Sequence, residues 1–549
     1  MKGSKFGLAK FLPLIIALSF VAGIFSGRIF YRSGSGGNGD KFEQILDMIQ
    51  TYYVDELNTD SLVELTIPHL LANLDPHSAY IPASDLQSVN DDLDGSFSGI
   101  GITFNMMGDT INVLEVLSGG PAEKVGLLAG DRIVTIDDSV AAGKKWTNER
   151  VMKTLRGAKG TKVKLGIKRS SSAGLLPFEL TRGDIPVSSI DVAYEVEPGV
   201  GLIKINKFGR NTYGEFLTEA IKLRERGVNK FIIDLRGNGG GYMEPAVLIA
   251  NEFLERGQLI VSTKGRFEGP SAMTAADGTG SLTDAEVVIM LDEYSASASE
   301  ILAGAIQDND RGVIVGRRSF GKGLVQNQMV LPDSSAVRLT VARYYTPSGR
   351  CIQKMYKLGE ALQYETELAM RYTNGELYSP DSIKIDTNLA YSTLTGRTVY
   401  GGGGIIPDVF VPNDTTGYSS YYISVVNGGL LQKYAFMYVD LNRGELSKCK
   451  SAEAVLGKLP PEDVLLQSFV DYAAGEGVAP RWIYINVSRK LLVTQLRALI
   501  CRDALDQAAY YQVFNRIDNG VEAALKVLKG GQARPPISLP LPFGNKRTR

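Results

Sequence analysis

The spacing of apolar residues between positions 201 and 291 changes repeatedly between the period of a strand and that of a helix. Strands are predicted at residues 201–206, 231–235, 259–262 and 287–291, and helices at residues 212–226 and 242–256. Gly227 and Gly257 follow the two helical patterns, where a glycine commonly ends a helix. Strands and helices that alternate in this way predict an α/β core, which we place at residues 184–412.

Helical patterns flank this core on both sides. Residues 41–90 are expected to form an N-terminal helical segment, and residues 413–532 a C-terminal helical domain. The patterns of the C-terminal domain lie at residues 421–439, 461–474 and 488–528. For this domain we expect packing, or contacts in a homo-oligomer, ahead of substrate selection. Residues 533–549 are proline-rich and basic and are expected to be disordered.

The first residues of the chain have the pattern of an export signal. Lys2, Lys5 and Lys10 accompany an uncharged apolar run over residues 11–27. We expect an uncleaved, single-pass anchor in the cytoplasmic membrane over residues 1–32, with a cleaved signal as the alternative. The positive charges keep this end in the cytoplasm, so the rest of the protein is expected in the periplasm or outside the cell. Residues 33–40 are then a linker.

Composition excludes several classes of partner and cofactor. The 549-residue chain has 59 Lys and Arg against 60 Asp and Glu, a net charge of −1, so no nucleic acid partner is expected. Its two histidines, His69 and His77, both precede the core. No histidines and cysteines have the spacing of a metal site, so we expect neither a metal nor another cofactor. The length indicates several domains.

Residues 91–183 have a different pattern from the core. Strands are predicted at residues 98–104, 110–116 and 132–137. Pro121 suits the first turn of a short helix, and Asn148 suits the cap of a helix that runs to residue 155. This stretch resembles a PDZ domain. The resemblance implies that a peptide C-terminus binds to backbone N–H groups of a loop made of Gly99, Ile100, Gly101 and Ile102.

Residues 234–241 read Asp-Leu-Arg-Gly-Asn-Gly-Gly-Gly and lie between a predicted strand and a predicted helix. A tight turn would explain one or two of these glycines. Four of them expose backbone N–H groups that can bind an anion or an oxyanion. We therefore interpret this turn as part of a functional site.

A second stretch with functional chemistry runs from residue 295 to residue 326. Three serines lie at the start of a helix predicted over residues 300–307: Ser295, Ser297 and Ser299. Lys322 follows Ser297 by 322 − 297 = 25 residues, and an outgoing helix with a strand returning at residues 313–315 would bring it back beside the serines. A lysine made neutral by burial can take the proton of a serine, so this spacing permits a serine–lysine pair.

Three other interpretations compete with this pair. Residues 316–323 nearly match a phosphate-binding loop, but Gly323 has no hydroxyl and the next residues have a strand pattern. Residues 319–322 match the Ser-x-x-Lys motif of penicillin-recognising enzymes, without the motifs that accompany it. Finally, serines at a helix start often act only as caps, beside a solvated lysine.

Several of these motifs together resemble the C-terminal processing (tail-specific) peptidases. They are Ser-Ala-Ser-Ala-Ser-Glu at residues 295–300, Phe-Gly-Lys-Gly at 320–323, Leu-Asp-Pro-His-Ser at 74–78, residues 234–241, Gln326 and the PDZ segment. They follow the family's order over about residues 41–412. The resemblance implies a multidomain α/β protein with a crotonase-like protease core and an inserted-type PDZ domain.

The resemblance also implies roles for individual residues. Ser297 is the nucleophile, Lys322 the general base and Gln326 the residue that positions it. The oxyanion hole combines the N–H of Ala298 with one from Gly239 or Gly240. We therefore expect a membrane-anchored serine endopeptidase that cleaves exported proteins near their C-termini through an acyl-enzyme, with protein or peptide tails as partners. The alternative is a non-catalytic PDZ scaffold that binds protein C-termini.

Overall fold

The computed structural model describes residues 38–531, apart from residues 118, 170–171, 268 and 270. The expected membrane anchor, most of the expected linker and the expected disordered tail lie outside these residues. The chain divides into two units, residues 1–73 and residues 74–549. The described part of the first unit contains two helices, α2 (Asn38–Tyr52) and α3 (Thr59–Leu71), as the apolar pattern predicts. No helix among the described residues is both long enough and apolar enough to cross a bilayer.

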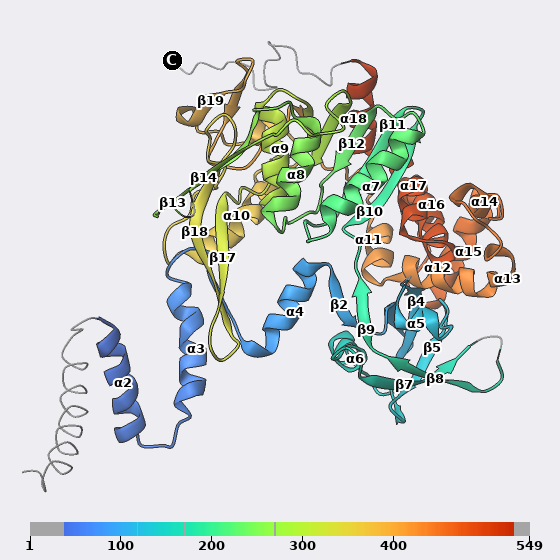
Figure 1. Ribbon diagram of the computed structural model, residues 1–549. Coiled ribbons are helices and arrows are strands. Elements are labelled where there is room, and N and C mark those ends of the chain that lie inside the picture. The colour runs from blue at the N-terminus through green and yellow to red at the C-terminus, as the bar shows by residue number, and fades with distance from the viewer. Residues whose placement is uncertain (1–37, 118, 170–171, 268, 270, 532–549) are drawn as a thin grey trace, which may run out of the picture. The chain divides into compact units, whose positions relative to one another are not determined.

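The centre of the second unit is a six-stranded sheet with the order β10-β11-β12-β15-β16-β21 (Figure 1). Its strands are β10 (Ile190–Glu197), β11 (Val200–Ile205), β12 (Lys230–Asp234), β15 (Glu286–Leu291), β16 (Val313–Gly316) and β21 (Val409–Phe410). All neighbours are parallel except β10 and β11. The α/β core is therefore confirmed, with strands at three of the four stretches predicted between residues 201 and 291 in this sheet.

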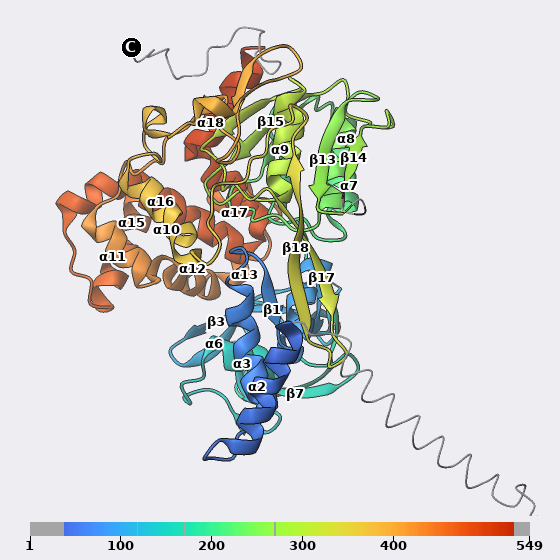
Figure 2. The same ribbon diagram turned by 90° about the vertical axis from the view of Figure 1, so that its left-hand side faces the viewer.

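Helices cover both faces of the sheet, as buried parallel strands require. One face packs against α7 (Thr212–Glu225), α8 (Met243–Phe253) and α9 (Ala298–Asp308), and its core includes Ile203, Phe231 and Ile289. The neighbouring residues Leu202 and Ile232 point to the opposite face and pack against α18 (Asn519–Lys529). Figures 1 and 2 show α18 beside these strands. Thus α18, which the sequence pattern placed with the C-terminal helices, completes the core.

A second, antiparallel sheet carries part of the candidate site. Its five strands are β1 (Ala79–Ile81), β13 (Leu259–Gly265), β14 (Ala272–Ala275), β17 (Leu324–Val330) and β18 (Ala336–Tyr345). The strand predicted at residues 259–262 is β13, so it belongs to this sheet and not to the parallel one. A register shift in the β17–β18 pair falls between Val325 and Gln326, and such a bulge changes the direction of a side chain.

The PDZ-like stretch contains a sheet of β3 (Ile102–Met107), β4 (Thr110–Val116), β5 (Arg132–Ile136), β6 (Ser139–Val140), β7 (Lys162–Lys168) and β8 (Leu175–Thr181), with helices α5 (Pro121–Lys124) and α6 (Asn148–Leu155). The single strand predicted at residues 98–104 is wrong. It is broken after Gly99 because Gly101 has φ +81°, which favours glycine. The first piece, β2 (Ser96–Gly99), pairs with β9 (Gly183–Pro186), where the chain leaves this stretch. The cap of α6 is Thr147, whose side chain accepts from Arg150 N, and not Asn148.

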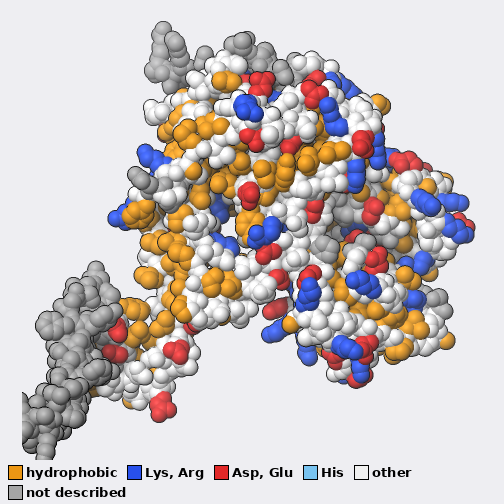
Figure 3. All heavy atoms as spheres, in the orientation of Figure 1, with side chains coloured by type: hydrophobic (Ala, Val, Ile, Leu, Met, Phe, Trp, Pro, Cys, Tyr) orange, Lys and Arg blue, Asp and Glu red, His pale blue; other side chains and the backbone are white. Residues whose placement is uncertain are grey.

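The C-terminal helices share one hydrophobic core, which includes Leu431, Phe469 and Leu496. The larger helices are α11 (Ser420–Asn427), α12 (Leu430–Leu441), α15 (Glu462–Gly475), α16 (Trp482–Ala504) and α17 (Gln507–Phe514). The helix predicted at residues 421–439 is split between α11 and α12 at Gly429, which has φ +64°. The helix predicted at residues 488–528 is also wrong as a single helix, because this stretch is divided among α16, α17 and α18. On the face shown in Figure 3, positive and negative side chains are interspersed, in agreement with the small net charge.

Candidate active site

A cavity of about 800 Å³ lies where α9, β17, β18 and the turn after β12 meet. The cavity is lined by all six residues predicted for the catalytic centre: Gly239, Gly240, Ser297, Ala298, Lys322 and Gln326. Ser297 and Lys322 therefore share one cavity, as the outgoing helix and returning strand predict.

The three serines at the start of α9 have different surroundings. Ser295 and Ser299 are fully buried, and their hydroxyls donate to backbone carbonyls of Leu235 and Asn238, at 2.9 Å in both cases. Ser297 is partly exposed and lines the cavity. Its φ is +56°, a conformation that costs on the order of 1–3 kcal/mol for a residue with a side chain. Ser297 is thus the serine whose side chain a substrate can reach.

Two backbone N–H groups beside Ser297 are available to an incoming oxygen. Within the described residues, the N–H groups of Ala298 and Gly239 have no hydrogen-bond acceptor. The Gly240 N–H already donates to Asn238 Oδ1 at 2.8 Å. Of the two predicted glycine donors, Gly239 is therefore the one left with a free N–H.

Gly240 has a steric role instead of a donor role. A Cβ added at Gly240 would lie 2.8 Å from Ser297 Cβ and 2.7 Å from the carbonyl oxygen of Ala296. Its φ of +101° also favours glycine. The close approach of this turn to the start of α9 therefore requires a residue without a side chain.

Lys322 lies in the loop before β17, and its ammonium group is partly buried. Its Nζ donates to Gln326 Oε1 at 3.0 Å, while Gln326 Nε2 donates to the carbonyl oxygen of His77 at 2.5 Å. The second hydrogen bond fixes the orientation of the amide, so that its oxygen faces the lysine. Burial, and then the positive charge of Arg338, lower the pKa of Lys322. Both effects favour the neutral amine that a base must be.

The Leu-Asp-Pro-His-Ser segment supports Gln326 through its backbone. Asp75 accepts from Ser78 Oγ at 2.6 Å and from Thr340 Oγ1 of β18 at 3.0 Å, which ties this turn to the second sheet. Burial, and then the charge of Lys322, lower the pKa of His77 to about 4, so its imidazole is neutral at neutral pH. Sequence reasoning did not identify this contact of His77, because Gln326 is bound by the backbone carbonyl oxygen of His77 and not by its imidazole ring.

Glu300 is a second residue that sequence reasoning missed. It is fully buried, and its oxygens accept from Ser297 N, Ser319 Oγ, Gly321 N and Lys322 N at 2.8, 2.5, 2.7 and 2.9 Å. This carboxyl joins the start of α9 to the loop that carries Lys322. Burial raises the pKa of Glu300 to about 7, against the effect of these hydrogen bonds. The Ser297-x-x-Glu300 spacing, a capping-box signature, was the available signal.

Tyr344 makes a parallel connection from β18. It is buried, and its hydroxyl lies 2.7 Å from the carbonyl oxygen of Lys322 and 3.2 Å from that of Ser297. One hydroxyl therefore contacts the backbone of both residues of the pair. No local pattern marks this tyrosine, because its partners lie 22 and 47 residues away.

The first half of the glycine-rich turn is structural. Burial opposes ionisation of Asp234, but the charges of Arg236 and Lys204 hold its pKa well below the usual range. Arg236 also pairs with Asp518 at the start of α18, at 3.0 Å. Asp234 and Arg236 thus fix the turn from outside the cavity.

The interpretation of residues 316–323 as a phosphate-binding loop is wrong. Strand β17 follows this stretch, where a phosphate-binding loop would be followed by a helix. The backbone N–H groups of Gly321 and Lys322, which would face phosphate, instead donate to Glu300.

A separate cavity of about 320 Å³ lies between β3 and α6 of the PDZ-like domain. Ile100, Gly101 and Ile102 line it, together with apolar side chains that include Met152 and Leu155. Gly99 does not line this cavity, because it is paired with Gly183 in the β2–β9 ladder. Three of the four predicted peptide-binding residues therefore lie at one groove.

Comparisons with known proteins identify families for three stretches of the chain. Residues 199–359 match the model of peptidase family S41, residues 98–176 that of the PDZ domain, and residues 421–506 that of a family of unknown function (DUF8443). The chain is 37% identical over 319 residues to the "Carboxy-terminal-processing protease" of Bartonella bacilliformis. This match covers 57% of this chain and 72% of the relative. It is 33% identical over 330 residues to a "Probable CtpA-like serine protease" of Staphylococcus haemolyticus, which covers 60% of this chain and 64% of the relative.

One solved structure, a photosystem II D1 C-terminal processing protease, is 29% identical, covers 57% of this chain and 89% of that chain, and has a TM-score of 0.32. The fold and the sequence matches define the class of the protein, a serine peptidase with a PDZ domain. More narrowly, the chain belongs to peptidase family S41, among the carboxy-terminal-processing proteases.

Proposed function

We propose that this protein is an endopeptidase that cleaves exported proteins near their C-termini with Ser297 as nucleophile and Lys322 as general base. The observation that supports the proposal is a single cavity lined both by Ser297, the partly exposed serine of α9, and by Lys322, a lysine with a lowered pKa. Histidine chemistry is a poor alternative in this cavity, because no histidine lines it among the described residues.

The proposed reaction passes through an acyl-enzyme. Neutral Lys322 takes the proton of Ser297 as Oγ attacks the peptide carbonyl carbon, and the N–H groups of Ala298 and Gly239 stabilise the oxyanion. Such donors are typically worth roughly 3–4 kcal/mol each in the transition state. The lysine then gives its proton to the leaving amine, and the C–N bond breaks. Water, deprotonated by the same lysine, hydrolyses the ester and regenerates the serine.

In the same proposal, the groove between β3 and α6 binds the tail of the substrate. Backbone N–H groups near Gly101 would take the terminal carboxylate, and the apolar wall would take the last side chain. The export pattern of residues 1–32 supports a location at the cytoplasmic membrane, with the catalytic part in the periplasm or outside. A homo-oligomer and a packing role for the C-terminal helices remain predictions.

Cleavage of a peptide with an apolar C-terminus tests the proposal. Ser297→Ala and Lys322→Met should each lose activity by at least about a thousandfold. Ser295→Ala and Ser299→Ala are matched controls that remove buried hydroxyls at the same helix start. They should lower the melting temperature while folded enzyme keeps most of its kcat. Activity of Ser297→Ala equal to wild type would remove the proposed nucleophile, and an inactive wild type would favour the PDZ scaffold.

A further inference from the structure

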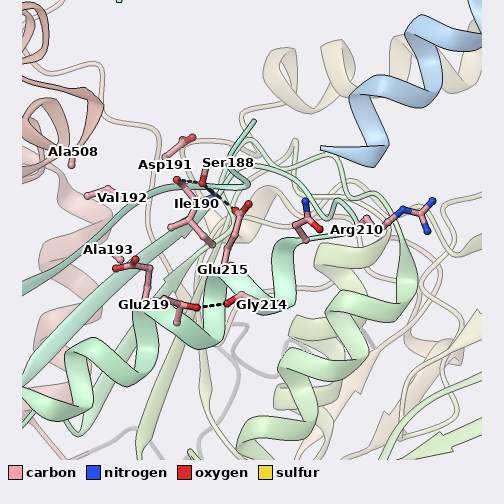
Figure 4. Close-up of a pocket in the computed structure, with 12 residues that line it drawn as sticks. Ser188, Ile190, Asp191, Val192, Ala193, Arg210, Gly214, Glu215, Glu219 and Ala508 are labelled. Carbon is pink, nitrogen blue, oxygen red and sulfur yellow. Dashed lines mark hydrogen bonds between the residues drawn. The ribbon is translucent and has the colours of Figure 1, made fainter. Parts of the chain in front are cut away.

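The catalytic cavity has an unusual charge balance. Lys207, Lys322 and Arg338 line it, and none of its described lining residues is an aspartate or a glutamate. Three other cavities of the described chain are each lined by three or more carboxylates. Figure 4 shows one of them, with Asp191, Glu215 and Glu219 around a space beside β10. The cavity that contains Ser297 is therefore lined by a net positive charge, whereas these three cavities are lined by a net negative one.

Among these three cations, Arg338 is held by a neutral amide and not by a carboxylate. It projects from β18, and its Nη2 donates to Gln328 Oε1 at 2.9 Å. Gln328 in turn donates to Asn90 Oδ1 at 2.9 Å, so a chain of neutral amides holds the guanidinium. Within the part of the chain that the structure describes, no carboxylate forms an ion pair with Arg338.

Other arginines of the core have a carboxylate partner. Arg318, Arg350 and Arg397 pair with Glu376, Asp308 and Asp310 at 2.5, 2.7 and 2.6 Å. A partly buried guanidinium normally has such a partner, because desolvation of an unpaired charge is costly. Arg338 lines the cavity and has no such carboxylate partner among the described residues.

We propose that Arg338 is a specificity-determining residue that binds a carboxylate of the peptide substrate close to the scissile bond. The proposal rests on the peptidase function proposed above. A guanidinium presents parallel N–H groups that match the two oxygens of a carboxylate. That carboxylate is either the C-terminus of the substrate or the side chain of an aspartate or glutamate.

The position of Arg338 relative to the pair supports this role. Arg338 lines the same cavity as Ser297 and Lys322, so a carboxylate bound to it lies in the cavity that contains the proposed catalytic pair. Among the described residues that line the cavity, none is a carboxylate that could compete for Arg338. Tyr242, another lining residue, donates to Asp94, and that carboxylate is already paired with Arg210 at 2.8 Å.

The test uses peptides that differ only in charge. In the first type of pair both peptides have an amidated C-terminus, and they differ by Glu or Gln at one position near the cleavage site. Such a pair is made for each of these positions in turn. A second pair has neutral side chains and ends in a free acid or an amide a few residues beyond that site. For wild type, one pair should show kcat/KM about tenfold or more higher for the charged member. The pair that shows it identifies the source of the carboxylate.

Variants then assign the preference to Arg338. Arg338→Met should bring the ratio close to one, and Arg338→Lys should retain part of it. Arg343→Met is the matched control, because Arg343 is exposed on the same strand and does not line the cavity. The ratio within one variant is independent of any change in the pKa of Lys322. A free-acid preference that survives in Arg338→Met belongs to the PDZ groove.

Two results would overturn the inference: a wild-type ratio near one in both pairs, or an unchanged ratio in Arg338→Met. If Arg338→Met does not cleave at all, fluorescence anisotropy of the labelled peptides on Ser297→Ala, with and without Arg338→Met, supplies the same ratio from Kd. Equal Kd ratios would then contradict the inference. Absence of cleavage by wild type contradicts the peptidase function, and the binding ratio still tests Arg338.

Discussion

Glu300→Gln tests whether the buried carboxyl holds the two halves of the site together. The carboxyl accepts four hydrogen bonds, two on each oxygen. A glutamine amide has one acceptor oxygen. In the orientation that costs less stability, the NH₂ of the glutamine faces Ser319 and Gly321. The Ser319 hydroxyl can then accept a hydrogen bond from it, but the backbone N–H of Gly321 loses its acceptor. A buried unpaired donor costs about 1–3 kcal/mol, and the opposite orientation costs about twice that.

The raised pKa of Glu300, about 7, makes the free energy of unfolding depend on pH. A carboxyl with a raised pKa binds its proton more tightly in the folded chain than in the unfolded one. Its stabilising contribution is complete below about pH 4.5 and is lost as the pH rises to about 7. Glutamine has no such dependence. The free energy by which Glu300→Gln is less stable than wild type should therefore shrink by about 2–3 kcal/mol between pH 5 and pH 8.

Urea unfolding at both pH values measures these quantities. Glu462→Gln is the control, because it makes the same chemical change at an exposed residue in the first turn of α15. It should cost less than about 1 kcal/mol, with little pH dependence. If Glu300→Gln matches this control in unfolding free energy at pH 5, Glu300 does not support the site as described.

Three further predictions concern the cavity. The kcat/KM of wild type should rise with pH along a curve whose apparent pKa lies below 10.5, since Lys322 acts when neutral and burial lowers its pKa; a profile that falls over this range contradicts the lysine base. Gly240→Ala should reduce activity at least about a hundredfold and lower the melting temperature, because its Cβ would meet Ser297, whereas Gly239→Ala has no close neighbour and should be tolerated; equal effects would contradict this packing. Gln326→Ala should lower kcat about ten- to a hundredfold with little change in KM, and an unchanged kcat would show that the lysine needs no positioning.

Local patterns predicted much of the fold. The positions of β11, β12, β15 and β16 follow from apolar runs, and the start of α9 follows from a serine-rich stretch before a helical pattern. The same patterns did not show that the helix predicted at residues 421–439 is broken at Gly429, or that the one predicted at residues 488–528 is divided among three helices. They also did not show that α18 packs on the core sheet. A helical pattern indicates an apolar face, but it does not indicate which surface covers it.

The site was predicted where its residues are close in sequence or carried by a recognisable motif. Ser297, Lys322 and Gln326 belong to such a stretch, and all three line one cavity. The groups that support them come from elsewhere: Tyr344 from β18, and the His77 carbonyl from a turn 249 residues before its partner. Contacts of this kind depend on the tertiary fold, so neither periodicity nor spacing could reveal them.

The most direct test of the Ser297–Lys322 mechanism is the mass of the acyl-enzyme. The protein is mixed rapidly with a peptide ester, quenched in acid, digested and analysed for the added acyl mass. Our account predicts the acyl group on the fragment that contains Ser297, at a normal rate in Ser295→Ala and Ser299→Ala. It predicts no acyl group in Ser297→Ala and acylation slowed by at least about a hundredfold in Lys322→Met. Acylation of Ser297→Ala, or an unchanged rate in Lys322→Met, would contradict it.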